Sequence, residues 1–148
     1  MHERLARIVL AVLAVSGAIV GLWATFAPRS FYDDFPGGGR SWVAPDGPFN
    51  EHLVRDVGSL NLALTVLTVA AAIMLVRSLV VVAALGWLAY GIPHLVYHLR
   101  HRDVYDTGDQ VANLVSLALI PVLAVVALVV GAKMPASRPR SSASSTSV

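Results

Sequence analysis

Four long apolar stretches dominate the hydrophobic pattern of the chain, and none contains Asp, Glu, Lys or Arg. They cover residues 8–27, 57–76, 78–97 and 111–132. In each stretch apolar side chains continue around the whole helix, whereas a soluble helix keeps one polar face. Each is close to the roughly 20 residues that a helix needs to cross the ~30 Å apolar core of a bilayer. The pattern predicts an all-α, polytopic membrane protein, an up-down bundle of four transmembrane helices that forms one domain over residues 1–132.

The segments that join the stretches differ in length. The link around Arg77 is very short, so the second and third helices are expected to form a tight hairpin with neighbouring outer ends. Residues 28–56 form a long outer loop with too few apolar side chains for a core of its own, and it is expected to lie across the mouth of the bundle. Asn50 is expected to cap the second helix, and Thr107 with Gln110 matches a capping box at the fourth.

The flanking charges predict the orientation. Arg4, Arg7 and Arg77 lie in very short segments on one side of the bundle, where the positive-inside rule acts most strongly. Both termini are therefore expected in the cytoplasm, and residues 133–148, rich in Ser, Pro and Arg, predict a disordered cytoplasmic tail. Abundant Ala, Val, Leu and Arg with scarce Lys favours a bacterial source, so the predicted location is the inner (cell) membrane.

Composition narrows the classes of function. Hydrophobic residues make up 56% of the chain and charged residues 14%, where a soluble domain has about 25% charged. The few basic residues flank apolar runs and form no patch, which argues against a nucleic-acid partner. With no cysteine in the sequence, any metal site would need His, Asp, Glu or Tyr ligands. No catalytic triad, phosphate loop or dinucleotide fingerprint is recognisable, so catalytic residues stay unknown.

Histidines gather on the predicted outer side, together with eight of the nine acidic residues. His94, His98 and His101 follow a spacing of four and three, which places them on one face of the third helix. His52 and Asp56 share a face at the start of the second helix. If the hairpin keeps the two helices antiparallel, these side chains are expected to lie near one another.

Two kinds of site are compatible with this pattern. The first is a polar site for a small molecule, formed by His52, His94, His98, Asp56, Glu51, Tyr97 and Asn61. The second is a metal site formed by His52, His94, His98 and His101, because imidazole and carboxylate together suit zinc, iron or manganese. A haem held by histidines from both helices is a further option. The same residue types also collect at the membrane interface without any chemistry.

His94 carries the strongest indication of a function, since it follows Pro93 and lies just inside the predicted apolar core. Ionisable groups at such depth usually face the interior of the bundle. Five polar side chains on the second and fourth stretches are expected either to bond between helices or to line a small polar cavity with His94. They are Asn61, Thr65, Thr68, Asn113 and Ser116.

Three functions stay open at this point. The first is a membrane protein with an outward-facing site for a small molecule or metal. The second is a metal- or haem-dependent membrane oxidoreductase that uses the same residues. The third is an accessory or structural subunit without catalysis. Besides the lipid bilayer, the partners could include a small-molecule ligand, a second copy of the chain or another membrane protein.

The chain resembles the DoxX-like small four-helix bacterial membrane proteins. The resemblance rests on the span count, the size and an opening that reads Arg-Ile-Val-Leu-Ala-Val-Leu-Ala from position 7 and Gly-Leu-Trp-Ala-Thr-Phe-Ala-Pro from position 21. It covers the whole chain in outline and implies the four-helix membrane fold. No functional residue is transferred, because the stretches that hold the histidines match no motif of that family.

Overall fold

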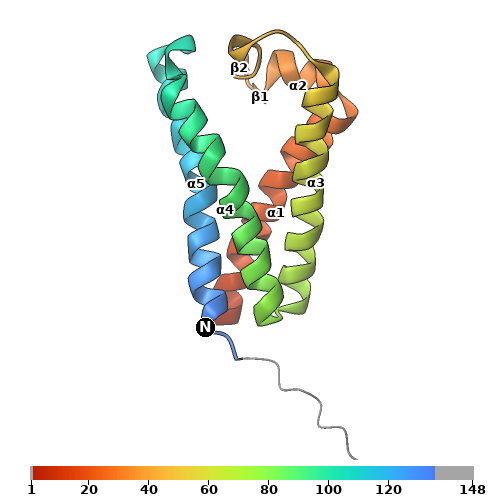
Figure 1. The fold of residues 1–148 in the computed structure, drawn as a ribbon, viewed down its shortest axis with the longest axis vertical. Coiled ribbons are helices and arrows are strands. Elements are labelled where there is room, and N and C mark those ends of the chain that lie inside the picture. Colours follow the sequence, from red (N-terminus) through yellow and green to blue (C-terminus); the bar gives the residue numbers. More distant parts are fainter. Residues whose placement is uncertain (1, 136–148) are drawn as a thin grey trace, which may run out of the picture.

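The structure, a computed structural model, describes residues 2–135 and consists almost entirely of helices (Figure 1). Its four long helices are α1 (His2–Phe26), α3 (Glu51–Met74), α4 (Arg77–Arg100) and α5 (Thr107–Ala132). All four are long and apolar enough to cross a membrane. The prediction of an all-α, four-helix membrane protein is confirmed. Most of the predicted tail, residues 136–148, lies outside the described residues.

The helices extend beyond the predicted spans, because their polar end turns stay helical. The side chain of Asn50 accepts a hydrogen bond from the backbone N–H of Leu53, which confirms it as the cap of α3. At α5 the predicted capping box is wrong by one residue. Asp106 is the cap and accepts from the N–H of Asp109, while the Gln110 side chain donates to the Tyr105 carbonyl.

The two ends of the bundle differ (Figure 1). At one end, called here the terminal end, lie the N-terminus, the link between α3 and α4 and the end of α5. At the other, called the roofed end, the segment predicted as a long loop contains regular elements. They are α2 (Pro28–Asp34), an antiparallel pair of short strands, β1 (Pro36–Gly37) and β2 (Arg40–Ser41), and a 3-10 turn (Ala44–Asp46). A second 3-10 turn (Arg102–Val104) joins α4 to α5.

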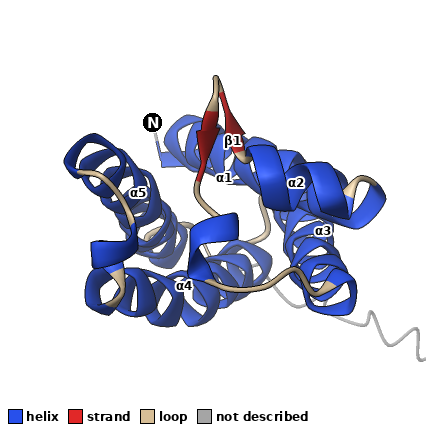
Figure 2. Ribbon diagram, turned by 90° about the horizontal axis from the view of Figure 1, so that it is seen from above, coloured by secondary structure: helices blue, strands red, loops and turns tan. Residues whose placement is uncertain are grey.

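Residues 28–50 form a roof over the long helices. Pro28 begins α2 at a position where its missing N–H costs nothing. The strand pair turns through Gly37, Gly38 and Gly39, whose positive φ angles suit glycine. Tyr32 donates a hydrogen bond of 2.5 Å to the Gly47 carbonyl, which ties α2 to the far end of this segment. Seen from above, the segment crosses the ends of the long helices before it enters α3 (Figure 2).

The long helices pack as two pairs, and this corrects one expectation. α1 packs most extensively on α3 and α4 on α5, whereas α3 and α4, the predicted tight hairpin, share far fewer contacts. Glycine explains the first pair: a Cβ added at Gly58 would lie 2.6 Å from the Thr25 backbone nitrogen, and one at Gly21 would lie 3.0 Å from the Leu62 nitrogen. The roofed ends of α3 and α4 are therefore not held together by direct packing.

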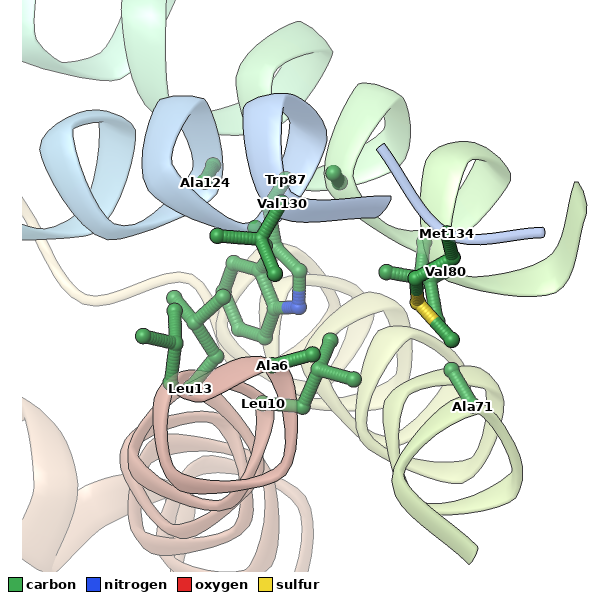
Figure 3. Close-up of a cluster of buried hydrophobic side chains, with 13 residues drawn as sticks. Ala6, Leu10, Leu13, Ala71, Val80, Trp87, Ala124, Val130 and Met134 are labelled. Carbon is green, nitrogen blue, oxygen red and sulfur yellow. The ribbon is translucent and has the colours of Figure 1, made fainter. Parts of the chain in front are cut away.

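Near the terminal end all four helices share one apolar core (Figure 3). α1 contributes Leu10 and Leu13, α4 contributes Val80 and Trp87, and the small residues of α5 allow close approach. Trp87 is almost fully buried and its indole N–H donates to the Thr68 hydroxyl at 2.7 Å. The buried polar atoms of Trp87 and Thr68 are thus paired, and apolar side chains fill the space between the helices below Trp87.

Candidate functional site

A cavity of about 470 Å³ lies between the long helices, under the roof. Its volume falls within the roughly 300–1,000 Å³ of small-molecule sites. Most of its wall is apolar: Phe31, Phe35 and Val43 from the roof, Val57 from α3, and Leu117 and Ile120 from α5 are examples. The polar side chains in the wall are fewer, namely Ser16, Trp42, Asp46, Asn61, Tyr90, His94, His98, Asn113 and Ser116.

Four polar atoms in this wall are buried and have no hydrogen-bond partner within the described part of the chain. They are Trp42 Nε1, Asp46 Oδ1, His98 Nδ1 and Asn113 Oδ1. The residues Trp42, His98 and Asn113 are only 8%, 7% and 5% exposed. An unpaired buried polar group destabilises the fold by roughly 1–3 kcal/mol. Four such groups around one cavity therefore indicate a place where a ligand supplies the missing hydrogen bonds.

Tyr105, between α4 and α5, fixes the roof above the cavity. Its hydroxyl lies 2.7 Å from the Trp42 carbonyl, to which it donates, and 3.2 Å from Asp46 Oδ2. Burial raises the pKa of Tyr105, and the nearby Asp46 carboxylate raises it further. The phenol therefore stays a neutral donor at physiological pH. Asp46 Oδ2 also lies 3.9 Å from His98 Nε2, so the carboxylate is shared between the tyrosine and the histidine.

Ring side chains follow one another along α4 from the core to the roof. Tyr90 stacks on His94 with centroids 5.4 Å apart, and the edge of His98 meets the His94 ring at 4.9 Å. Asn61 on α3 donates to the Tyr90 hydroxyl at 3.2 Å, across the cavity wall. Ring contacts thus hold both imidazoles in place. Tyr90, His94 and His98 follow one another along α4 from the packed core toward the roof.

The structure divides the residues predicted for a small-molecule site. His94, His98 and Asn61 line the cavity. His52, Asp56 and Glu51 do not, because they lie on the exposed face of the first turns of α3. There His52 Nδ1 lies 3.4 Å from Asp56 Oδ2, and Glu51 pairs with Arg55 at 2.9 Å.

Tyr97 and His101, the other predicted site residues on α4, also lie outside the cavity wall. Their rings stack at 4.1 Å, and His101 Nδ1 lies 2.9 Å from the Tyr97 carbonyl oxygen. Tyr97 is 43% exposed. The pair forms a local contact at the end of α4.

The predicted metal set His52, His94, His98 and His101 is not assembled as one group. Within residues 2–135, no three or more His, Asp or Glu side chains are placed so that they could hold a metal ion. The reason is the helix pairing: α3 packs on α1 and α4 on α5, so the face of α3 that carries His52 is not brought against the histidines of α4.

Sequence reasoning missed Trp42 and Asp46 as cavity residues, and Tyr105 as the residue that holds them in place. Trp42 and Asp46 lie in the segment read as a loop, and Tyr105 in the short link that follows α4. Aromatic residues in a segment beside a membrane were the one signal in the sequence, because such rings often sit at an interface. Asp46 and Tyr105 lie near His98 because of how the roof folds, which the periodicity of the sequence does not encode.

Comparisons of this chain with protein-family models, with curated proteins and with solved structures found no match.

Proposed function

We propose that this multi-pass membrane protein binds a small amphipathic molecule in the cavity under its roof. The observation that carries the proposal is the group of unpaired buried polar atoms on Trp42, Asp46, His98 and Asn113 in an otherwise apolar wall. A bound polar head would pair these atoms, and the apolar wall would surround the rest of the molecule.

Filling the cavity tests this function. Leu117 lines the cavity and is half-buried, so Leu117→Trp places an indole inside it. Leu85 on α4 is 50% exposed and lies outside the cavity wall, so Leu85→Trp adds the same indole where lipid can accommodate it. The measurement is mass spectrometry of small molecules extracted from each purified protein.

We expect one compound to co-purify in near-stoichiometric amount with the unaltered chain and with Leu85→Trp, and to be lost from Leu117→Trp. If the unaltered chain carries no such compound, or if folded Leu117→Trp carries as much, the proposal fails.

We further propose that the roofed end faces the outside of a bacterial cell membrane and that both termini are cytoplasmic. The supporting observation is that Arg4, Arg7 and Arg77 lie in short segments at the terminal end. The chain has no cysteine, so single cysteines can report the sides: His52→Cys for the roofed end and Ser78→Cys for the other. An impermeant maleimide should label only His52→Cys in intact cells; the reverse result would invert the orientation.

A further inference from the structure

The charge of the cavity wall restricts the head group of the ligand. This inference rests on the proposed binding function. Among the lining residues, all within residues 2–135, Asp46 is the one carboxylate, and none is Lys or Arg. A half-buried carboxylate with no Lys or Arg in the wall repels an anion, and the low-dielectric surroundings strengthen that repulsion. The imidazole of His98, whose Nε2 lies 3.9 Å from Asp46 Oδ2, offsets this charge only when it is protonated. Fatty acids and anionic phospholipids are therefore disfavoured.

The unpaired atoms restrict the head group further. The indole N–H of Trp42 can only donate a hydrogen bond, whereas Asp46 Oδ1 and Asn113 Oδ1 can only accept one. A quaternary ammonium offers neither donor nor acceptor, and a primary ammonium offers donors alone. A hydroxyl is the smallest group that both donates and accepts, so an uncharged, hydroxyl-bearing head satisfies both kinds of atom.

The cavity also opens sideways, between α1 and α5. Ile19 on α1 and Leu119 on α5 both line the cavity, yet they are 55% and 50% exposed. Ser116 likewise lines it and is exposed. Residues that face both a cavity and the outside mark an opening in its wall. In a membrane that opening meets lipid chains.

The helical positions agree with an opening on this side. A Cβ at Gly17 would lie 2.6 Å from Thr65 Oγ1 of α3, so that face of α1 meets α3. Ile19, two residues on, lies about 200° around the helix from it. In the same way Pro121 lies on the side of α5 that faces Gly91 of α4, and Leu119 is about 200° away. Ile19 and Leu119 therefore lie away from the two closely packed helix pairs.

We infer that the ligand is an uncharged lipid with a hydroxyl head, of the monoacylglycerol or fatty-alcohol class. Its head lies under the roof against Trp42, Asp46 and Asn113. Its chain leaves the cavity between α1 and α5 and enters the surrounding lipid.

The test compares three probes that share one dibrominated C18 chain: the glycerol monoester, the free fatty acid and the primary amine. Bromine quenches nearby indoles, and Trp42 and Trp87 line the cavity whereas Trp23 does not. The full chain with Trp23→Phe is placed in phosphatidylcholine nanodiscs, and tryptophan quenching is titrated at neutral pH. We expect half-maximal quenching by the monoester at a concentration about tenfold below that of either charged probe.

Two variants sharpen the result. Asp46→Asn removes the wall charge, so it should bring the fatty acid to within about threefold of the monoester. Leu119→Trp blocks the lateral opening and should abolish retention of the monoester. Because this substitution adds an indole, the retained monoester is measured by mass spectrometry of the purified protein and not by quenching. Val122→Trp, at a lipid-exposed position of α5 that is 57% exposed, is the matched control and should leave this retention unchanged.

Three outcomes overturn the inference. If the acid or the amine binds more tightly, the head group is not uncharged. If Leu119→Trp and Val122→Trp behave alike, the chain does not leave between α1 and α5. If no probe saturates while a compound still co-purifies, the lipid class is wrong but the binding function stands; loss of both results removes both proposals.

Discussion

Near the terminal end, the four helices fill the space between them with Leu10, Leu13, Val80 and Trp87, and the buried polar atom of Trp87 is paired. Under the roof the same helices enclose a cavity whose wall keeps four polar atoms unpaired. Both halves are built from Ala, Val, Leu and Gly in continuous helices. The difference teaches that the apolar pattern sets the helices, while side-chain volume and a few polar residues decide which half is scaffold and which is available for a ligand.

The largest expected effect breaks the packed half. Leu10 is fully buried, so Leu10→Ala leaves a void. Lipid solvates leucine as well, so mainly the cavity part of the usual cost applies, on the order of 1–3 kcal/mol. Unfolding in mixed micelles with increasing sodium dodecyl sulfate, followed by circular dichroism, measures the change.

Leu117→Ala is the matched substitution in the cavity wall. Since Leu117 already borders open space, its truncation should cost less than about 1 kcal/mol. Equal losses for the two variants would show that the halves are packed alike and would remove the contrast.

An intermediate effect is expected from Tyr105→Phe, which loosens the roof without touching the packed half. It removes the hydroxyl that donates to the Trp42 carbonyl and lies 3.2 Å from Asp46 Oδ2, a loss of about 1 kcal/mol. Amides of residues 35–47 should then exchange with deuterium about fivefold faster. Tyr97→Phe is the control, because the structure gives the Tyr97 hydroxyl no hydrogen bond within residues 2–135. Uniform acceleration along all four helices would mean that the roof and the packed half open together.

The smallest expected effect concerns the ion pair that links the roof to α5. Arg40 Nη1 lies 2.8 Å from Asp109 Oδ1, but its side chain is 48% exposed. Exposed ion pairs contribute about 0–1 kcal/mol and weaken with salt, so Arg40→Ala should speed exchange in residues 35–47 less than about twofold. The measurement is repeated at low and high salt. An effect as large as that of Tyr105→Phe would make this ion pair an equal support of the roof.

The helices could be read from the sequence because each is a continuous apolar run of spanning length, and Asn50 marks one start through its own local hydrogen bond. The pairing of helices could not be read in the same way. It depends on where Gly21 and Gly58 let backbones approach, and a glycine in a sequence does not name the helix that it will meet.

The candidate site was predicted only where a local pattern in the sequence marks its residues. His94 and His98 were found because helical spacing places them on one face, and Asn61 because a polar residue within an apolar span stands out. His52 and Asp56 satisfy the same spacing rule on α3 but lie on its exposed face. Trp42 and Asp46 reach the cavity through the fold of the roof, which is held by tertiary contacts such as that of Tyr105 with the Trp42 carbonyl.

Only Leu75 and Val76 separate α3 from α4, and Leu75 ends α3 in a left-handed conformation with φ of 49°. A change of angle at this short link would tilt the α4–α5 pair relative to the α1–α3 pair. α4 has 24 residues, so at 1.5 Å per residue a tilt of about 5° at the joint displaces its far end by about 3 Å. At that far end the pairs are connected through the roof, by Tyr105 and by Arg40 with Asp109. A small angular adjustment at this joint would therefore widen or narrow the cavity while the packing within each pair is kept, and such an adjustment would let one site accept head groups of different girth.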